Sequence, residues 1–380
     1  MPARVFITVA EVSGDQHAAQ LVRSLRRLDP AMEIEGHGGP LMREAGATIH
    51  RETTVRARMG LAGMTRALEV WKLLRWTKAY FGRHRPDLYV GVDSPSMNFA
   101  FAKLAKSMGV PVLQYVAPQL WAWREGRIKQ VRARVDHLAC ILPFEEGYFR
   151  ERGVAATFVG HPLFDELPSG GSAAAIAAVR PTLAGRPPVV GLLTGSRRGE
   201  ALTNYPDLLA VAAEVRCAFP GATFLAPTTP ASHPVVVDLS RRHPDIAVAL
   251  GGFDEMVPRC DLCVTVSGTA TLHVAAHGVP MVVTYRMSPG VVRLGRWLMT
   301  TDTFALVNLL APGRTHIVPE FIPLTGSPRP VVECALELLR DPAQLEAQRS
   351  RLATLVGTLD HPGASDNVAR IAMGLMGRGT

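Results

Sequence analysis

The sequence predicts an α/β protein of two doubly wound domains, each a parallel sheet covered by helices, facing each other across a cleft. Three observations predict this class. The chain has 380 residues, more than one hydrophobic core usually takes. Short apolar runs alternate with helical patterns, as expected when a parallel sheet is covered on both faces. A segment rich in Gly, Pro, Ser and Ala, residues 166–187, interrupts this alternation, which then starts again.

The first half of the chain predicts one domain, residues 1–168. Its first strand is an apolar run at residues 5–9, and the helix after it repeats apolar side chains at i, i+3, i+4 and i+7. Four further strands are expected at residues 88–92, 112–116, 137–142 and 157–159.

The second half predicts a joint at residues 169–187 and a second domain at residues 188–363. Its strands are expected at residues 189–193, 223–226, 246–250, 262–266 and 281–284. The chain from about residue 330 is expected to be helical, and its last helix, about residues 364–380, to pack back on the first domain.

The composition limits the classes of partner. With 47% hydrophobic and 19% charged residues, the chain is globular. A formal net charge of +8 favours acidic partners such as phosphates, nucleotides or anionic lipid. The basic residues are spread along the chain, and only 6% of residues are aromatic, so nucleic-acid binding is disfavoured.

The cysteine pattern and the lengths of the apolar runs indicate the cellular compartment of the protein. Five scattered cysteines do not form a disulfide framework and favour a reducing cytoplasm. Cys260 and Cys263 have no second Cys or His pair at zinc-site spacing, so no metal site is expected. The N-terminal apolar run is too short for a signal peptide, and no run reaches the ~20 residues that span a bilayer. The protein is expected to be soluble or to lie on a membrane surface.

Two turns of the second half predict an anion site. In open α/β sheets, ligands bind beyond the carboxyl ends of strands. Glycine and hydroxyl residues there, at a helix N-terminus, present free N–H groups to an anion, and arginine suits a phosphate. Helix capping alone would explain one such turn, but two at equivalent strand ends favour a diphosphate. The residues concerned are Gly195, Ser196, Arg197, Ser267, Gly268 and Thr269.

Carboxylates follow the strands of the first half. Asp93 comes after an apolar strand and is the first candidate for a general base, since partial burial suits proton abstraction. Glu11 and Asp15 follow the first strand, together with Ser13 and Gly14. For Asp93 and for Asp15, the simpler role is to cap the helix that follows each of them.

Motifs along nearly the whole chain resemble the lipid-A-disaccharide synthase family. They include AEVSGDQHAA (10–19), GVDSPSMN (91–98), YVAPQLWAWREGRIK (115–129), FVGHPLFDE (158–166), GSRRGE (195–200), SGTATL (267–272), NLLAPGR (308–314) and HPGAS (361–365). The resemblance implies two Rossmann-like domains of the GT-B type. It also implies an inverting transfer of diacylglucosamine from UDP to the 6-hydroxyl of diacylglucosamine 1-phosphate, with no cofactor and no metal.

The resemblance also implies residue roles. The N-terminal domain holds the acceptor and the base, with Asp93 as base, Glu11 or Asp15 in reserve, and acceptor contacts from Ser13, Gly14, Trp123 and Arg124. The C-terminal domain holds UDP on the two turns, with His273 and Asn308. Family members commonly carry Glu at the position of His273, and the family's LPNLLAGR becomes LVNLLAPGR here.

The family's membrane association fits residues 59–81, where Leu61, Met64, Leu68 and Trp71 share one helical face beside basic residues. An ordinary amphipathic core helix would show the same pattern. The implied location is the cytoplasmic face of the inner membrane, and a homodimer is possible in this family. Two alternatives stay open: another UDP-sugar enzyme of this architecture, such as a UDP-N-acetylglucosamine 2-epimerase, and a non-catalytic lipid- or nucleotide-binding relative.

Overall fold

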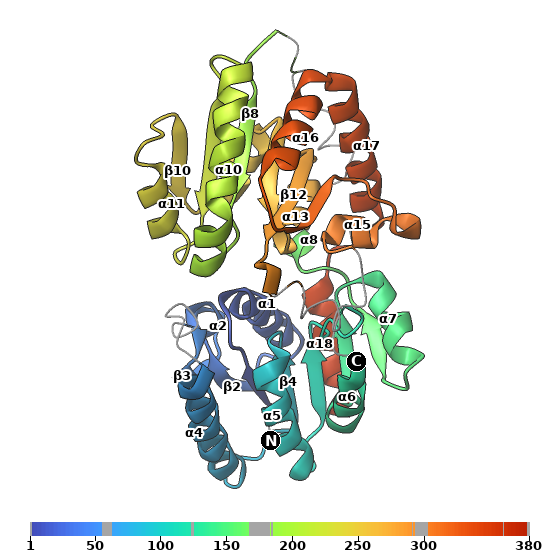
Figure 1. Ribbon diagram of the computed structural model, residues 1–380. Helices are drawn as coiled ribbons and strands as arrows, with labels where there is room; N and C mark the ends of the chain where they lie inside the picture. The colour runs from blue at the N-terminus through green and yellow to red at the C-terminus, as the bar shows by residue number, and fades with distance from the viewer. Residues whose placement is uncertain are drawn as a thin grey trace. The chain divides into compact units, whose positions relative to one another are not determined.

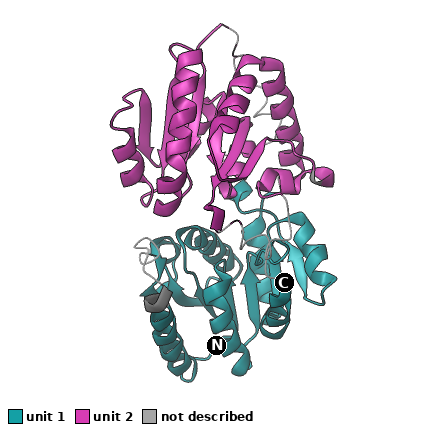
Figure 2. Ribbon diagram, viewed as in Figure 1, with its two compact units in different colours: residues 1–167, 361–380 teal, residues 168–360 magenta. Residues whose placement is uncertain are grey.

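The computed structural model divides the chain into two compact units (Figure 2). Unit 1 comprises Met1–Leu167 and His361–Thr380, and unit 2 comprises Pro168–Asp360. The structure describes residues 2–54, 63–122, 125–166, 183, 185–290, 292, 303–359 and 361–377. Each unit is a parallel sheet with flanking helices, so the predicted fold class is confirmed for the two units taken separately.

Unit 1 contains a seven-stranded parallel sheet in the order β3-β2-β1-β4-β5-β6-β7 (Figure 1). The strands are β1 (Arg4–Thr8), β2 (Glu33–Gly38), β3 (Thr48–Glu52), β4 (Leu88–Val92), β5 (Val112–Tyr115), β6 (His137–Cys140) and β7 (Ala156–Phe158). The helices are α1 (Val12–Leu28), α2 (Pro40–Glu44), α4 (Gly63–Phe81), α5 (Pro95–Ser107), α6 (Ile128–Arg134), α7 (Pro143–Arg150), α8 (Leu163–Glu166) and α18 (Ala364–Leu375). Strand β1 pairs with β2 on one side and with β4 on the other. The order of the strands therefore changes direction between β1 and β4, which is the switch point of the sheet.

Two strands of unit 1 were not predicted, because β2 and β3 carry charged residues in place of an apolar run. In β2, Glu35 is nearly buried and accepts hydrogen bonds from Tyr80 Oη at 2.5 Å and from His50 Nε2 at 3.0 Å. His37 is fully buried and bonds Thr77 at 2.9 Å. Polar side chains with buried partners therefore replace the hydrophobic pattern on which the strand prediction depended.

The last helix of the chain, α18, belongs to unit 1 and packs on α1. Its buried side chains Val368, Ala369 and Ala372 join the core that contains Val5 and Leu21. At its N-terminus, the carboxylate of Asp165 accepts the backbone N–H groups of residues 363, 364 and 365 at 2.6, 3.2 and 3.1 Å. A carboxylate at this end also suits the helix dipole.

Unit 2 contains a six-stranded parallel sheet in the order β10-β9-β8-β11-β12-β13. The strands are β8 (Val189–Leu193), β9 (Thr223–Thr228), β10 (Ile246–Leu250), β11 (Leu262–Val266), β12 (Met281–Arg286) and β13 (Glu320–Leu324). The helices are α10 (Arg198–Ala218), α11 (His233–Ser240), α12 (Phe253–Met256), α13 (Thr269–Ala276), α15 (Leu306–Leu310), α16 (Arg329–Arg340) and α17 (Pro342–Leu359). Strand β13 was not predicted, because Glu320 and Pro323 interrupt its pattern. Among the described strands it pairs with β12 alone, at the edge of the sheet, where a proline is tolerated.

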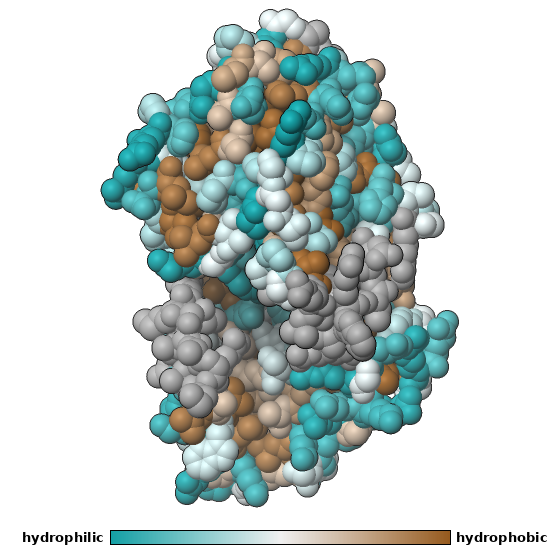
Figure 3. All heavy atoms as spheres, viewed as in Figure 1, coloured by the Kyte–Doolittle hydropathy of each residue, from teal (hydrophilic) through white to brown (hydrophobic). Residues whose placement is uncertain are grey.

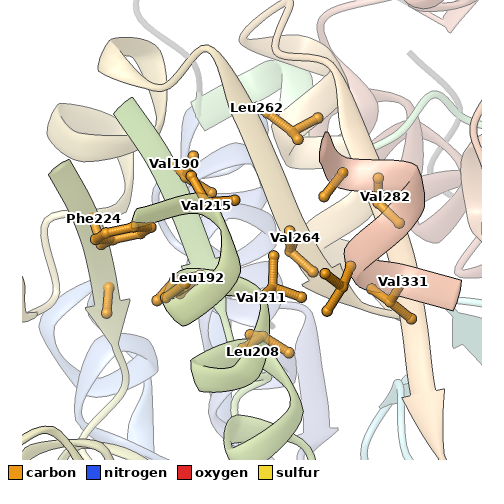
Figure 4. Packing of buried hydrophobic residues seen from close by; sticks show 14 of the residues in the cluster. Val190, Leu192, Leu208, Val211, Val215, Phe224, Leu262, Val264, Val282 and Val331 are labelled. Carbon is orange, nitrogen blue, oxygen red and sulfur yellow. The ribbon is translucent and has the colours of Figure 1, made fainter. Parts of the chain in front are cut away.

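The core of unit 2 forms between α10, α16 and the sheet. Figure 4 shows Leu208, Val211 and Val215 of α10 above the strands. Facing residues labelled in the same view are Val190, Leu192, Phe224, Leu262, Val264, Val282 and Val331. Each such side chain contributes about 1.5–3 kcal/mol when fully buried. This packing holds α10 against the sheet, and the turn between β8 and α10 is one of the predicted anion turns.

Among the described helices, none is both long enough and apolar enough to span a bilayer.

Candidate active site

The carboxyl ends of β4 and β5 carry three residues in the left-handed region. Asp93 and Ser94 have φ of 52° and 37°, and Val116 has φ of 66°. Such values cost an L-residue on the order of 1–3 kcal/mol each, most for a β-branched residue. Strain of this kind persists only where neighbouring groups hold it, and it concentrates at functional sites.

Buried side-chain amides hold the backbone of Asp93. Asn98, which is fully buried, donates its Nδ2 to the main-chain oxygen of Asp93 at 2.7 Å. Gln114 Nε2 donates to the same oxygen at 3.1 Å, and the Asp93 N–H donates to Tyr115 O at 2.9 Å. Thr8 Oγ1 in turn donates to Asn98 Oδ1 at 2.8 Å. These bonds fix the half-buried Asp93 at the strand end.

The start of α1 lies against Asp93. A Cβ added to Gly14 would lie 3.6 Å from Asp93 Cβ, in ordinary contact, and 2.8 Å from Val9 Cγ1, where one of the two groups would have to shift. Glu11 precedes the helix and is partly exposed, and Ser13 is exposed. The structure thus brings Glu11, Ser13, Gly14 and Asp93 to one region of unit 1.

Asp15, considered above as a reserve base, caps a neighbouring helix in the structure. It is only 1% exposed, and its carboxylate accepts the backbone N–H groups of Gly39, Leu41 and Met42 at 2.9, 3.0 and 3.3 Å. It therefore caps α2 rather than its own helix. Three N–H donors hold this buried carboxylate against the start of α2.

A buried carboxyl lies in the LPFE segment after β6. Glu145 accepts Trp121 Nε1–H at 3.1 Å and the Leu142 N–H at 3.2 Å, and it is 1% exposed. Burial raises its pKa to about 7. Trp123 and Arg124, expected on the acceptor side, lie outside the described residues.

In unit 2, the turn after β8 packs on the end of β11. Gly195 has φ of 86°, and an added Cβ would lie 2.5 Å from Glu200 Oε2 and 2.9 Å from Val266 Cγ2. Both the backbone conformation and the lack of space require glycine here. Because β8 and β11 are neighbours in the sheet, the two predicted anion turns lie side by side.

Arg197 and Ser196 are exposed at this turn. The Arg197 side chain is 65% exposed and its Nη1 lies 2.9 Å from Glu200 Oε1. The Arg197 backbone N–H also donates to Glu200 at 3.2 Å. The guanidinium is thus held at the start of α10 with part of its charge already balanced by Glu200.

At the second turn, which follows β11, Ser267 forms hydrogen bonds to two other segments of unit 2. Its N–H donates to Thr284 O at 3.3 Å and its hydroxyl to Phe304 O at 2.8 Å. The donors that remain for an anion are the exposed Thr269 and the amides of α13 that precede Thr271, whose own N–H donates to Gly268 O at 3.1 Å. Gly268, also exposed, lets a ligand approach these amides.

Asn308 is bonded to neighbouring segments of unit 2, and its expected contact with the donor stays a prediction. It is fully buried, and its Nδ2 donates to Val318 O and to Glu320 Oε2, both at 3.0 Å. Its Oδ1 accepts the Val318 N–H at 3.0 Å. Glu320 also accepts the Phe304 N–H at 2.6 Å. Asn308 is therefore linked through Glu320 to Phe304, whose carbonyl accepts the Ser267 hydroxyl.

His273 lies one turn into α13 beyond the anion turn. Its side chain is 25% exposed, its Nε2 is 2.8 Å from Asp254 Oδ1, and its ring stacks on Phe253 at 4.4 Å. Burial lowers the pKa of His273 below its ordinary value, although Asp254 opposes this. We therefore expect a neutral imidazole at pH 7.

Comparison with known proteins identifies the family. A family model described as lipid-A-disaccharide synthetase matches residues 5–364. A lipid-A-disaccharide synthase of Geobacter metallireducens is 36% identical over 99% of this chain and 98% of its own length. One of Geobacter sulfurreducens is 35% identical over the same shares. The chain belongs to the lipid-A-disaccharide synthase family. It is therefore a glycosyltransferase, as the resemblance implied.

Solved structures similar to this member of the lipid-A-disaccharide synthase family show its fold. Staphylococcus aureus MnaA with UDP has a TM-score of 0.65 at 11% identity, covering 100% of this chain and 98% of its own. Acinetobacter baumannii MurG has a TM-score of 0.56 at 14% identity, covering 98% and 100%. A Neisseria meningitidis UDP-GlcNAc 2-epimerase bound to UDP-GlcNAc has a TM-score of 0.59 at 11% identity, covering 99% of each chain. The GT-B type is confirmed, and likeness to epimerases at the level of fold does not favour the epimerase alternative.

Sequence reasoning missed three residues that shape this synthase-family site. Asn98 ends one resembling motif and Gln114 directly precedes another, but nothing in their spacing shows that both reach the Asp93 carbonyl. Glu145 lies in LPFE (142–145), in the first turn of α7, where a carboxylate is expected to be solvated; its contact with Trp121 comes only with the fold. In each case the missing information is a contact between elements.

Proposed function

We propose that this chain transfers diacylglucosamine from UDP to the 6-hydroxyl of diacylglucosamine 1-phosphate, forming the β-1,6 disaccharide and UDP, with Asp93 as general base. One observation carries the assignment of the base. Asp93 is a strained, half-buried carboxylate at the switch point of unit 1, and its backbone is fixed by Asn98 and Gln114. Of the carboxylates considered for this role, Asp15 is occupied as a helix cap, which leaves Glu11 as the reserve.

The proposed reaction is a single displacement. The acceptor 6-oxygen attacks the anomeric carbon from the face opposite UDP, and Asp93 takes the hydroxyl proton. The new carbon–oxygen bond forms as the bond to the UDP oxygen breaks, so the configuration at the anomeric carbon inverts. The bonding electrons leave with UDP as negative charge on its phosphate.

Unit 2 would receive that charge. Arg197 and the amides at the starts of α10 and α13 are exposed donors beside each other, contributed by the turns at Gly195, Ser196, Gly268 and Thr269. Donors held in position before the reaction stabilise developing charge without further reorganisation. His273 would contact the ribose hydroxyls in place of the family's glutamate, with an imidazole nitrogen as partner.

We further propose that α4 contacts the membrane on the cytoplasmic side of the inner membrane. Leu68 and Trp71 are 62% and 56% exposed. Lys72, Arg75 and Lys78 are exposed on the same helix, with Arg75 5.7 Å from the Trp71 ring centre. In the view of Figure 3, hydrophobic residues are visible over α4 and α5 among hydrophilic ones. Exposed apolar side chains flanked by cations suit an anionic lipid surface. The side chains of Leu61 and Met64 lie outside the description.

One assay tests the function. The protein is incubated with UDP-diacylglucosamine and diacylglucosamine 1-phosphate, and the disaccharide and UDP are measured together. We expect both products in equal amounts. UDP binding without disaccharide would instead support a non-catalytic relative, and conversion of a UDP-sugar to its epimer would support the epimerase. The homodimer possible in the family stays a prediction, tested by sedimentation velocity.

A further inference from the structure

Two imidazoles and a carboxylate converge at the end of α13. His273 and His277 are separated by one helical turn, and Nε2 of each lies 2.8 Å from the same oxygen, Asp254 Oδ1. The two rings stack, with centres 5.2 Å apart and planes 20° apart. One ligand atom from each of the three residues lies within 4.8 Å of the others.

This arrangement has the composition and spacing of a metal-ligand set. Two histidines four apart on a helix present their nitrogens on one side, as metal-binding helices do. Around a tetrahedral ion with bonds of about 2.0–2.1 Å, ligand atoms lie about 3.3 Å apart. The observed 2.8 Å between each nitrogen and the carboxylate oxygen would open by roughly half an ångström to admit the ion.

The surroundings of the three residues also suit an ion. Phe253 stacks on His273 at 4.4 Å and thereby fixes the ring, which reduces the entropy lost on ligation. His273 and His277 are 25% and 12% exposed, whereas Asp254 is 54% exposed. The histidines are therefore held inside, and the carboxylate side is open for entry of the ion and for a bound water.

We propose that Asp254, His273 and His277 bind one divalent transition-metal ion, with zinc as the ion whose ligand preferences the set fits. Zinc accepts histidine nitrogen and aspartate oxygen in a four-coordinate arrangement, with water at the position left open. Sequence reasoning considered only Cys260 and Cys263 as metal ligands. It missed this set because Asp254 lies in another helix, α12, and comes beside the histidines only in the fold.

The ion would also change what His273 offers to a nucleotide, a consequence that rests on the proposed function. Ligation through Nε2 leaves the proton on Nδ1, and that N–H becomes a fixed hydrogen-bond donor. The family's glutamate can only accept from a ribose hydroxyl, whereas metal-bound His273 would donate to it.

The test is a zinc titration of the full-length protein without nucleotide. The protein carries no histidine tag and is treated with chelator and dialysed. Because Cys217 is an exposed thiol that could bind zinc, every sample carries Cys217→Ser. Binding is measured by calorimetry, and cobalt is added separately to read the visible absorption of a four-coordinate site.

The proposal expects saturation at one ion per chain. His277→Ala and Asp254→Asn should each weaken zinc binding by at least about tenfold, as loss of a ligand does. His243→Ala, a variant of a partly buried histidine elsewhere in unit 2, should bind as the parent does. His277→Gln, together with thermal melting of each variant, separates lost binding from lost folding.

Two results would overturn the proposal. One is absence of saturable zinc binding in the parent protein, and the other is equal binding in the parent and in folded His277→Gln and Asp254→Asn. Because no nucleotide is present, either result leaves the proposed glycosyl transfer untouched.

Discussion

Asn98 donates its side-chain amide to the main-chain carbonyl of Asp93 at 2.7 Å, from a position that water does not reach. The bond joins the first turn of α5 to the strained end of β4. It holds Asp93 in a conformation that the residue would not adopt alone. A buried amide therefore sets the direction of a candidate base without touching substrate.

Replacing Asn98 with Ala should reduce both stability and turnover. The change removes the amide that donates to the Val92 and Asp93 carbonyls and the oxygen that accepts from Thr8. Asp93 O keeps its bond from Gln114, and Thr8 keeps its bond to Tyr89, so we expect a loss of about 1–3 kcal/mol in all. Urea unfolding measures the loss of stability, and kcat for disaccharide formation measures the loss of positioning. Ser107→Ala, at the exposed end of α5, is the matched control and should change neither.

Asp93→Asn should lower kcat by about 10²–10⁴-fold, because an amide cannot take the proton of the acceptor hydroxyl. The dissociation constant for UDP should stay within about twofold, since the change is confined to the proposed acceptor side. Steady-state kinetics and calorimetry with UDP measure the two quantities. Glu11→Gln is the paired variant: a large loss there, with Asp93→Asn active, would assign the base to Glu11 instead.

Arg197→Ala should weaken UDP binding by about 10- to 100-fold, because a charge-assisted hydrogen bond contributes about 1.5–3 kcal/mol. Glu200→Gln should strengthen it, since the neutral side chain no longer balances the guanidinium at 2.9 Å. Calorimetric titration with UDP checks both directions. Arg241→Ala, at an exposed pair in the same unit, should bind UDP normally, and equal weakening there would remove the specific role from Arg197.

The pKa of Glu145, raised to about 7 by burial, predicts a pH dependence of stability. The folded state keeps its proton up to about pH 7, whereas the unfolded chain loses it near pH 4.5. Glu145 therefore contributes its full stabilisation at pH values below its pKa in the unfolded chain. This contribution falls as the pH rises through its pKa in the folded state, by about 3 kcal/mol in all. Urea unfolding at pH 5 and pH 8 measures the fall.

Glu145→Gln should reduce that fall, because glutamine does not titrate. Glu151→Gln, a neighbouring position with a largely exposed side chain, should keep it. An unchanged pH dependence in Glu145→Gln would assign the effect to other groups.

Leu68→Ser combined with Trp71→Ser should reduce binding to anionic vesicles by about tenfold or more, because two exposed apolar side chains lose their contact with lipid. Vesicle sedimentation at low and physiological salt measures it. Leu250→Ser removes a side chain that is 58% exposed on unit 2 and should bind like the parent. If the double variant binds equally well, α4 is not the membrane contact.

The fold was largely predictable from the sequence, and the site only in part. All ten expected strands are present, because buried parallel strands need continuous apolar runs such as residues 88–92 and 262–266. Strands β2, β3 and β13 were missed, since their polar residues find partners only in the folded chain. The same reason explains why the hydrogen bonds of Asp15 and Asn308 were not predicted. Residue type and position suggested roles in the reaction, whereas the structure shows bonds to backbone amides and carbonyls of other elements.

The return of the chain to unit 1 through α18 has a consequence for how the protein is made. Unit 2 is a continuous stretch and can fold as soon as its residues leave the ribosome. Unit 1 lacks one wall of its core, including Val368 and Ala372, until the final helix emerges. The first part synthesised is therefore completed only after unit 2, and its hydrophobic surface stays open until α18 has emerged.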